Sequence, residues 1–220
     1  MGIKVKICGI RTLEAARAAV EAGADAVGFV FAPGRRRVEA GEAREIIRLL
    51  PPEVTKVGVF VDSPAEEVLA VAAYTGLTTL QFHGRESPGY CLLFPQPVIK
   101  AVALRGEEDL LLLAAYSVDA FLVDACKPGE PVPAGGTGAR ADWALAGKAT
   151  VLGRVYLAGG LEPGNVREAL EQVRPFGVDV SSGVETGGEK DAGKIRDFIE
   201  QVRRWEREAA ACGCRDGDAG

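Results

Sequence analysis

Eight short apolar runs alternate with helical patterns along the chain, and this alternation limits the possible folds more than any other feature. Most runs are continuously apolar, which is typical of strands buried on both faces of a parallel sheet. The runs occupy residues 3–8, 26–31, 56–61, 78–83, 98–103, 120–125, 155–160 and 178–182. Helical spacing predicts helices at residues 13–21, 40–50, 65–73, 87–94, 107–116, 139–146, 163–173 and 191–207. The pattern predicts an α/β protein.

The size of the repeating unit favours a closed barrel over an open sheet. A unit of about 25–28 residues is close to that of a (β/α)8 TIM barrel. In an open doubly wound sheet the first strand should lead into G-x-G-x-x-G, and this chain has Ile-Cys-Gly-Ile at residues 7–10. No linker or composition shift divides the chain. We therefore expect a single-domain barrel over residues 1–207, followed by a loose tail at 208–220 that lacks periodicity.

Charge and composition exclude several classes of partner. The net charge of −5 and the isoelectric point of about 5.2 argue against a nucleic-acid-binding protein. Every apolar run falls short of the roughly 18 residues that a membrane span needs, and the charged N-terminus does not resemble a signal peptide. Five scattered cysteines favour a reducing cytoplasm. Monomer and homodimer both remain open.

Two late strands end in small residues that suit a phosphate group. Residues 177–183 read Gly-Val-Asp-Val-Ser-Ser-Gly, and residues 157–161 read Leu-Ala-Gly-Gly-Leu. Small residues let backbone N–H groups approach an anion closely, and a following helix N-terminus adds a favourable dipole. Barrels often bind phosphate after their seventh and eighth strands. These residues predict a phosphate site at the ends of the two strands.

Cys8 and Asp124 stand at the ends of the first and sixth predicted strands. A thiolate can take a proton from carbon, and a buried carboxylic acid can deliver one. Cys8 could equally be a small buried core residue. The case for Asp124 is stronger, because a carboxylate after Phe-Leu-Val is costly to bury without a purpose. The pair predicts acid–base chemistry at the barrel mouth.

Other polar residues leave more than one interpretation open. His83 is the single histidine, which makes no metal site, and a structural hydrogen bond suits it as well as catalysis. Lys100 lies in an apolar strand and could be a Schiff-base nucleophile, although a polar buried role is favoured. Cys212 and Cys214 form C-x-C without a nearby histidine, so we expect no metal there. The run Gly135-Gly136-Thr137-Gly138 suits a flexible turn or a lid.

Several motifs in order carry a resemblance to a known family. They are Lys6-Ile7-Cys8-Gly9, the segments 24–31 and 57–61, Gln81-Phe82-His83-Gly84, Gly135-Gly136-Thr137-Gly138, Gly159-Gly160-Leu161 with Asn165-Val166, and the segment 178–185. With these motifs the chain, from Lys4 to about Ile199, resembles the phosphoribosylanthranilate isomerases of tryptophan biosynthesis.

The resemblance implies a reaction and a role for each motif. The family carries out an Amadori rearrangement of N-(5-phosphoribosyl)anthranilate to 1-(2-carboxyphenylamino)-1-deoxyribulose 5-phosphate, without cofactor or metal. It implies that Asp124 is the general acid, Cys8 the general base and Arg37 the ligand of the anthranilate carboxylate. The phosphate of this small-molecule phosphosugar is then expected on the backbone N–H groups of Gly159, Gly160, Ser182 and Gly183. The expected site wall consists of Gln81, His83, Gly136 and Asp179.

The chain departs from the family pattern at three places. Arg35-Arg36-Arg37 replaces the usual Ser-Pro-Arg, which leaves open which arginine binds substrate, and Phe82 and Ala158 replace a common Leu and Ser. Rival interpretations are another phosphosugar barrel, such as indoleglycerol-phosphate synthase or an aldolase that uses Lys100, and a non-catalytic barrel that binds a phosphorylated ligand. Activity toward the related histidine-pathway aminoaldose also remains open.

Overall fold

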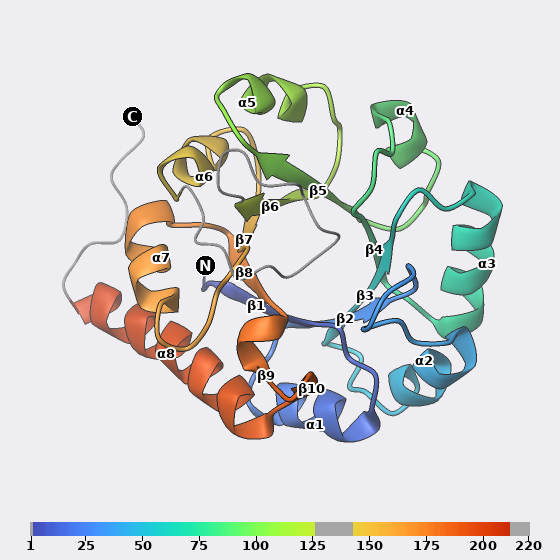
Figure 1. Cartoon of the computed structure of the whole chain (residues 1–220), viewed down its shortest axis with the longest axis horizontal. Helices are drawn as coiled ribbons and strands as arrows, with labels where there is room; N and C mark the ends of the chain where they lie inside the picture. Colours follow the sequence, from blue (N-terminus) through green and yellow to red (C-terminus); the bar gives the residue numbers. More distant parts are fainter. Residues whose placement is uncertain (1, 126–142, 212–220) are drawn as a thin grey trace.

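The computed structural model of the chain describes residues 2–125 and 143–211. Eight parallel strands pair in sequence order, and the last pairs with the first, so the sheet closes into a barrel (Figure 1). They are β1 (Lys4–Cys8), β2 (Ala26–Val30), β3 (Thr55–Phe60), β4 (Thr79–Phe82), β5 (Val98–Leu104), β6 (Ala120–Ala125), β7 (Val155–Ala158) and β8 (Gly177–Val180). The predicted (β/α)8 TIM barrel is confirmed.

Helices form a ring around the barrel (Figure 1). They are α1 (Leu13–Glu21), α2 (Ala40–Ile47), α3 (Ala65–Thr75), α4 (Pro88–Cys91), α5 (Glu108–Leu113), α6 (Trp143–Ala149), α7 (Val166–Val173) and α8 (Ala192–Ala211). Local signals set several ends: the Thr12 hydroxyl accepts a hydrogen bond from the Ala15 N–H at 3.2 Å, and Gly76 ends α3 at a positive φ of 81°.

Two differences from the sequence prediction have local causes. The helix predicted at 87–94 forms only over Pro88–Cys91 (α4), because Gly89 and Pro95 limit it. Helix α8 continues to Ala211 and so includes residues that were assigned to the loose tail. Alanine is the best helix former, and the Arg204–Glu208 ion pair at 2.8 Å supports this last part of the helix. The remaining tail residues, 212–220, lie outside the described part.

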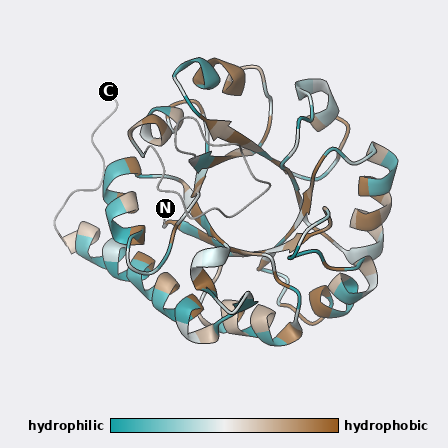
Figure 2. Ribbon diagram, in the orientation of Figure 1, coloured by the Kyte–Doolittle hydropathy of each residue, from teal (hydrophilic) through white to brown (hydrophobic). Residues whose placement is uncertain are grey.

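The strands alternate between two cores. Residues that face outward pack against the helices in the larger cluster, for example Ile7, Val27 and Leu157. The smaller cluster fills the barrel interior and consists of Ala26, Val57, Ile99, Ala101, Ala120, Leu122 and Ala158, with Tyr156 against it. Figure 2 shows the strands mostly in the hydrophobic colour and hydrophilic segments along α7 and α8. Burial on both faces of the strands, as predicted, is confirmed.

An excursion after β8 completes the barrel mouth. A short 3-10 helix, Ser182–Val184, leads into a small antiparallel hairpin of β9 (Glu185–Thr186) and β10 (Glu189–Lys190). The hairpin lies beside α1, close to the ends of β1 and β8 (Figure 1). It therefore brings charged residues to the edge of the site.

Candidate active site

A pocket lies at the carboxyl ends of the strands, where barrels carry their chemistry. Both proposed acid–base residues line it, although β7 and β8 separate their strands. Its described lining residues are Cys8, Val30, Ala32, Pro33, Gly34, Arg35, Arg36, Val59, Val61, Gln81, His83, Leu122, Asp124, Ala158, Gly159, Gly160, Leu161, Asp179, Val180, Ser181 and Ser182. The structure thus brings together in one pocket residues that are far apart in the sequence, as their positions at strand ends predicted.

Cys8 sits at the last position of β1, and a glycine on the neighbouring strand makes room for it. The side chain is buried, and Cys8 pairs in register with Gly28 of β2. A Cβ atom at Gly28 would lie 2.9 Å from the Cys8 Sγ, so any larger residue would collide with the thiol. The chain turns away directly afterwards at Gly9, with φ of 82°, and the Ser181 hydroxyl donates to the Cys8 carbonyl at 3.0 Å.

Asp124 occupies the matching end of β6 and is partly buried. Burial raises the pKa of its carboxyl group above the usual range, and the nearby charge of Asp179 raises it further. A carboxyl group with a raised pKa holds a proton more readily near neutral pH. Its environment therefore suits a proton donor.

Below these two residues, a buried ion pair crosses from β1 to β8. The Lys6 Nζ lies 2.6 Å from the Asp179 carboxylate, and the Lys6 side chain is fully buried. Burial lowers the pKa of Lys6, but the charges of Asp179 and Cys8 and the hydrogen bonds to both together outweigh this effect and hold the pKa above its usual value. Asp179 was expected in the site wall, whereas Lys6 was missed. The sequence feature that could have identified Lys6 is its charge inside an apolar strand, two residues before Cys8.

The two loops that are predicted to bind phosphate follow β7 and β8. Gly159 and Gly160 both have positive φ values, 87° and 61°, which glycine adopts without strain. The Asn165 side chain holds this loop by donating to the Gly160 carbonyl at 2.8 Å and accepting from the Glu162 N–H at 2.9 Å.

The β8 loop packs directly against the β7 loop. A Cβ atom at Gly183 would lie 1.9 Å from the Leu161 carbonyl oxygen, so only glycine allows this close approach. Ser182 and Gly159 also line the same pocket. The two predicted halves of the phosphate site are thus adjacent, and their role as phosphate ligands stays a prediction.

Gln81 of β4 and His83, directly after the strand, form a hydrogen-bonded pair. The Gln81 Nε2 lies 3.1 Å from the His83 Nδ1, and burial lowers the pKa of His83, which favours the neutral ring. If the amide donates, as this network assigns it, the His83 Nε2 carries the proton. The Gln81 Oε1 is buried and has no hydrogen-bond partner in the described part of the chain. The pair offers the pocket one acceptor and one donor.

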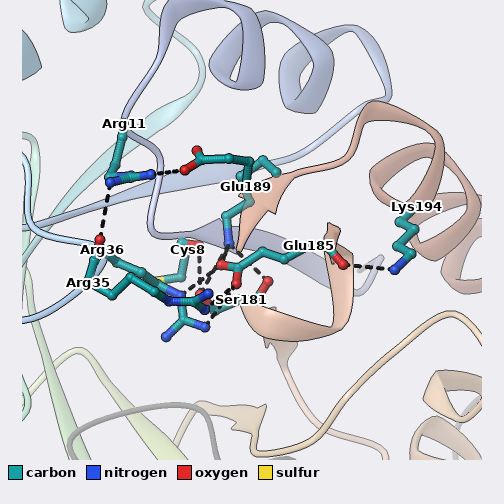
Figure 3. Close-up of polar contacts among 9 residues, drawn as sticks. Cys8, Arg11, Arg35, Arg36, Ser181, Glu185, Glu189 and Lys194 are labelled. Carbon is teal, nitrogen blue, oxygen red and sulfur yellow. Dashed lines mark hydrogen bonds and ion pairs between the residues drawn. The ribbon is translucent and has the colours of Figure 1, made fainter. Parts of the chain in front are cut away.

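Glu185 is the common partner of several cations at the rim of the pocket (Figure 3). The sequence analysis did not predict this role. Its carboxylate accepts from the Arg36 Nε at 2.7 Å, the Arg35 Nη2 at 2.7 Å and the Lys190 Nζ at 2.7 Å. Lys190 also donates to the Ser181 carbonyl at 2.9 Å. Burial alone raises the pKa of Glu185, but the hydrogen bonds from Arg36 and Lys190 bring it down to about 2.

Arg37 lies apart from this cluster. Its guanidinium pairs with Glu39 at 3.2 Å, and the two side chains are 50% and 68% exposed. It is not among the described residues that line the pocket, whereas Arg35 and Arg36 are. The assignment of the carboxylate ligand to Arg37 therefore stays a prediction.

Lys100 does not have the environment of a Schiff-base nucleophile. Its Nζ donates to the Glu86 carboxylate at 2.9 Å and to the Gly84 carbonyl at 2.8 Å, and the ion pair is almost fully buried. It is absent from the described lining of the pocket. The structural interpretation of Lys100 is confirmed, and the aldolase alternative loses its nucleophile.

Some predictions concern residues outside the described part of the chain. Gly136, with the rest of the glycine-rich run 135–138, falls there, as do Cys212 and Cys214. Within residues 2–125 and 143–211, no cluster of three or more His, Cys, Asp or Glu residues could hold a metal ion. No helix in these same ranges is long and apolar enough to cross a membrane.

Comparisons with known proteins agree with this geometry. Residues 5–201 match the family model described as N-(5'phosphoribosyl)anthranilate (PRA) isomerase. The N-(5'-phosphoribosyl)anthranilate isomerase of Desulforudis audaxviator is 56% identical over 201 residues, which covers 90% of this chain and 97% of that relative. The relative from Geobacter sp. is 50% identical over 203 residues, which covers 91% of this chain and 98% of that protein.

Solved structures lead to the same family. The phosphoribosyl anthranilate isomerase of Thermus thermophilus superimposes with a TM-score of 0.82 at 40% identity, covering 92% of this chain and 99% of that one. A phosphoribosyl anthranilate isomerase in complex with reduced 1-(o-carboxyphenylamino)-1-deoxyribulose 5-phosphate gives a TM-score of 0.80 at 40% identity, with the same coverage. Around one barrel mouth the chain carries a thiol, a carboxyl group and two glycine loops, and it is similar to these relatives over most of its length. The protein therefore belongs to the N-(5'-phosphoribosyl)anthranilate isomerase family.

Proposed function

We propose that this chain isomerises N-(5-phosphoribosyl)anthranilate to 1-(2-carboxyphenylamino)-1-deoxyribulose 5-phosphate, a step of tryptophan biosynthesis. The observation that carries the proposal is that Cys8 and Asp124 line one pocket together with the glycine loops after β7 and β8. Relatives of this family, and the solved structure with the reduced product, support the substrate.

The two ends of the substrate fix its orientation. The phosphate lies against the backbone N–H groups of Gly159, Gly160, Ser182 and Gly183, whose loops pack together at the mouth. The anthranilate carboxylate meets an arginine of the loop after β2. The ribose then lies between Cys8 and Asp124.

Asp124 starts the reaction as a general acid. Its proton goes to the ring oxygen of the ribose, the bond from that oxygen to C1 breaks, and C1 becomes the carbon of a protonated Schiff base. The raised pKa of Asp124 supports this role, because the proton must be held until the substrate is bound.

Cys8 completes the rearrangement as a general base. Its thiolate removes the proton from C2, and the electron pair of that C–H bond forms the double bond of an enolamine. Tautomerisation moves a proton from the C2 hydroxyl to C1 and leaves a ketone at C2. C1 is reduced as C2 is oxidised, so the reaction needs no external oxidant and belongs to the intramolecular oxidoreductases.

The role of Cys8 also bears on where the protein works. An oxidised or disulfide-bonded Cys8 could not accept a proton. The proposal therefore requires a reducing compartment such as the cytoplasm.

The test follows the fluorescence of the anthranilate group. Phosphoribosylanthranilate is generated in place from anthranilate and phosphoribosyl pyrophosphate with the transferase, and its fluorescence falls when this protein isomerises it. We expect a decay that persists with a chelator present and slows by about 10²–10⁴-fold in Asp124→Asn, the usual contribution of a general acid. Absence of decay with folded wild-type protein and confirmed substrate would refute the proposal.

A further inference from the structure

Lys6 has no part in the chemistry described above, although its ion-pair partner Asp179 lines the pocket and raises the pKa of Asp124. Lys6 and Asp179 are paired in register across β1 and β8, with Lys6 fully buried. Moving two charges out of water is costly, and a well-packed apolar pair often stabilises a core as well or better. Stability is therefore a weak reason for a lysine inside this barrel.

The geometry places the Lys6 ammonium next to the Cys8 thiol. The two residues are two positions apart on β1, so both side chains point into the barrel. Both the Cys8 Sγ and the Lys6 Nζ lie close to Gly28 on β2: a Cβ atom at Gly28 would lie 2.9 Å from the Sγ and 3.2 Å from the Nζ. Sulfur and ammonium thus approach the same point of the neighbouring strand.

Charges on every side of Cys8 act on its thiol. The pKa of Cys8 is raised overall, chiefly by burial and further by Asp179, while Lys6 is the strongest influence that lowers it and Lys190 of the hairpin also lowers it. Arg36 approaches from the loop after β2 but is held by Glu185. Asp124 of β6 and His83, directly after β4, line the same pocket. Lys190 is paired with Glu185 and Lys6 with Asp179, and of these cations Lys6 has the largest lowering effect on the pKa of Cys8.

We propose that Lys6 is a positioning residue for the general base: its ammonium, anchored by Asp179, stabilises the Cys8 thiolate and fixes its place below the substrate. This inference rests on the proposed function for the role of Cys8 in turnover. Asp179 keeps the ammonium charged inside the barrel and aims it along β1. The pair therefore serves the thiolate, and not the fold alone.

The thiol itself supplies a readout that needs no turnover. Alkylation by iodoacetamide proceeds through the thiolate, so its rate against pH follows thiol ionisation. Mass spectrometry of the peptide that contains Cys8 measures this site apart from the other cysteines. In Lys6→Met we expect the midpoint of the curve to rise by at least about one pH unit, with a roughly tenfold slower reaction at neutral pH.

Two variants make the comparison specific. Lys4→Met is the matched control, because Lys4 is on the same strand but pairs with Asp25, at 2.7 Å, away from the pocket. Its curve should match the wild type. Lys6→Arg keeps the charge and should restore a large part of the lost reactivity. An unchanged midpoint in folded Lys6→Met, or an equal shift in Lys4→Met, would overturn the inference.

Lys6→Met leaves the Asp179 charge unpaired and could prevent folding. The double variant Lys6→Met with Asp179→Asn removes both charges, and we expect a smaller shift in the same direction; no shift in the folded double variant would overturn the inference. Turnover is measured separately: the activity of Lys6→Met should fall at neutral pH and recover as pH rises. Wild-type protein without isomerase activity would refute the proposed function, while the alkylation result would still decide the role of Lys6.

Discussion

Arg36 holds Glu185 through two hydrogen bonds, from its Nε at 2.7 Å and its Nη2 at 3.1 Å. The Glu185 side chain is 6% exposed, so moving Arg36 away from it toward a substrate would break contacts in a nearly buried cluster. Arg37, by contrast, pairs with Glu39 at 3.2 Å in solvent. Exposed pairs of this kind contribute about 0–1 kcal/mol. Arg37 can therefore turn toward a carboxylate at little cost, although it does not line the pocket in this structure.

Replacing Arg37 with Met should weaken substrate binding more than it slows the chemistry. A hydrogen bond to a charged group contributes about 2 kcal/mol, which corresponds to roughly a 30-fold rise in KM. Steady-state fluorescence assays measure KM and kcat separately. Arg48→Met is the matched control, since Arg48 pairs with Glu45 on the exposed side of α2. A KM for Arg37→Met equal to that of the control would move the carboxylate site to another arginine.

The sequence predicted the barrel and the meeting of Cys8 and Asp124 at one mouth because both depend on strand ends. Counting apolar runs places Cys8 at the end of β1 and Asp124 at the end of β6, and closure of the barrel brings both to one mouth. No knowledge of helix packing is needed for this step. The same reasoning placed Gly159 and Ser182 beside each other.

Partners that are distant in the sequence could not be predicted in this way. Lys6 meets Asp179, and Arg36 meets Glu185, only because β1, β2 and the hairpin after β8 become neighbours on closure. Lys100 shows the effect of strand parity. Its neighbours Ile99 and Ala101 face the interior, so Lys100 points outward to Glu86, and a continuously apolar run conceals this alternation.

Glu185 should make stability depend on pH in the acid range. Its pKa in the folded protein, about 2, lies below the ordinary value of 4.5. Its contribution is therefore complete above about pH 4.5 and is lost as the pH falls toward 2. At pH 7, Glu185→Gln should lower the free energy of unfolding by about 3 kcal/mol, because it leaves Arg36 and Lys190 without their counter-ion. Urea unfolding at pH 7 and at pH 3 measures this difference.

The control for Glu185 comes from the same hairpin. Glu189 pairs with Arg11 but is 65% exposed, so Glu189→Gln should change stability by less than about 1 kcal/mol at either pH. The difference in the free energy of unfolding between wild type and Glu185→Gln should be smaller at pH 3 than at pH 7. A gap of equal size at both pH values would show that the carboxylate charge is not what stabilises the rim.

Lys100 should contribute to the stability of the fold and should form no covalent bond with a substrate. Lys100→Met leaves Glu86 as a buried unpaired charge, and we expect a loss of about 3–5 kcal/mol in the free energy of unfolding. Glu86 also accepts hydrogen bonds from the Asp62 and Gly84 N–H groups, so the loops after β3 and β4 should loosen together. Borohydride treatment with a carbonyl substrate should leave Lys100 unlabelled. Covalent label on Lys100 would restore the aldolase interpretation.

Gln81 should contribute through its side chain, which lines the pocket together with His83 and has a buried oxygen without a hydrogen-bond partner in the described part of the chain. An acceptor next to a ring N–H donor complements a sugar hydroxyl, which both donates and accepts. Gln81→Met keeps the size of the side chain but removes the acceptor and the contact that sets the His83 tautomer. We expect kcat/KM to fall about tenfold, the effect of losing one or two ordinary hydrogen bonds. Gln96→Met is the matched control, because Gln96 also has a buried oxygen without a partner among the described residues but is not among those that line the pocket. If both variants lost the same activity, the loss would come from packing, and the Gln81 oxygen would have no role in binding the sugar.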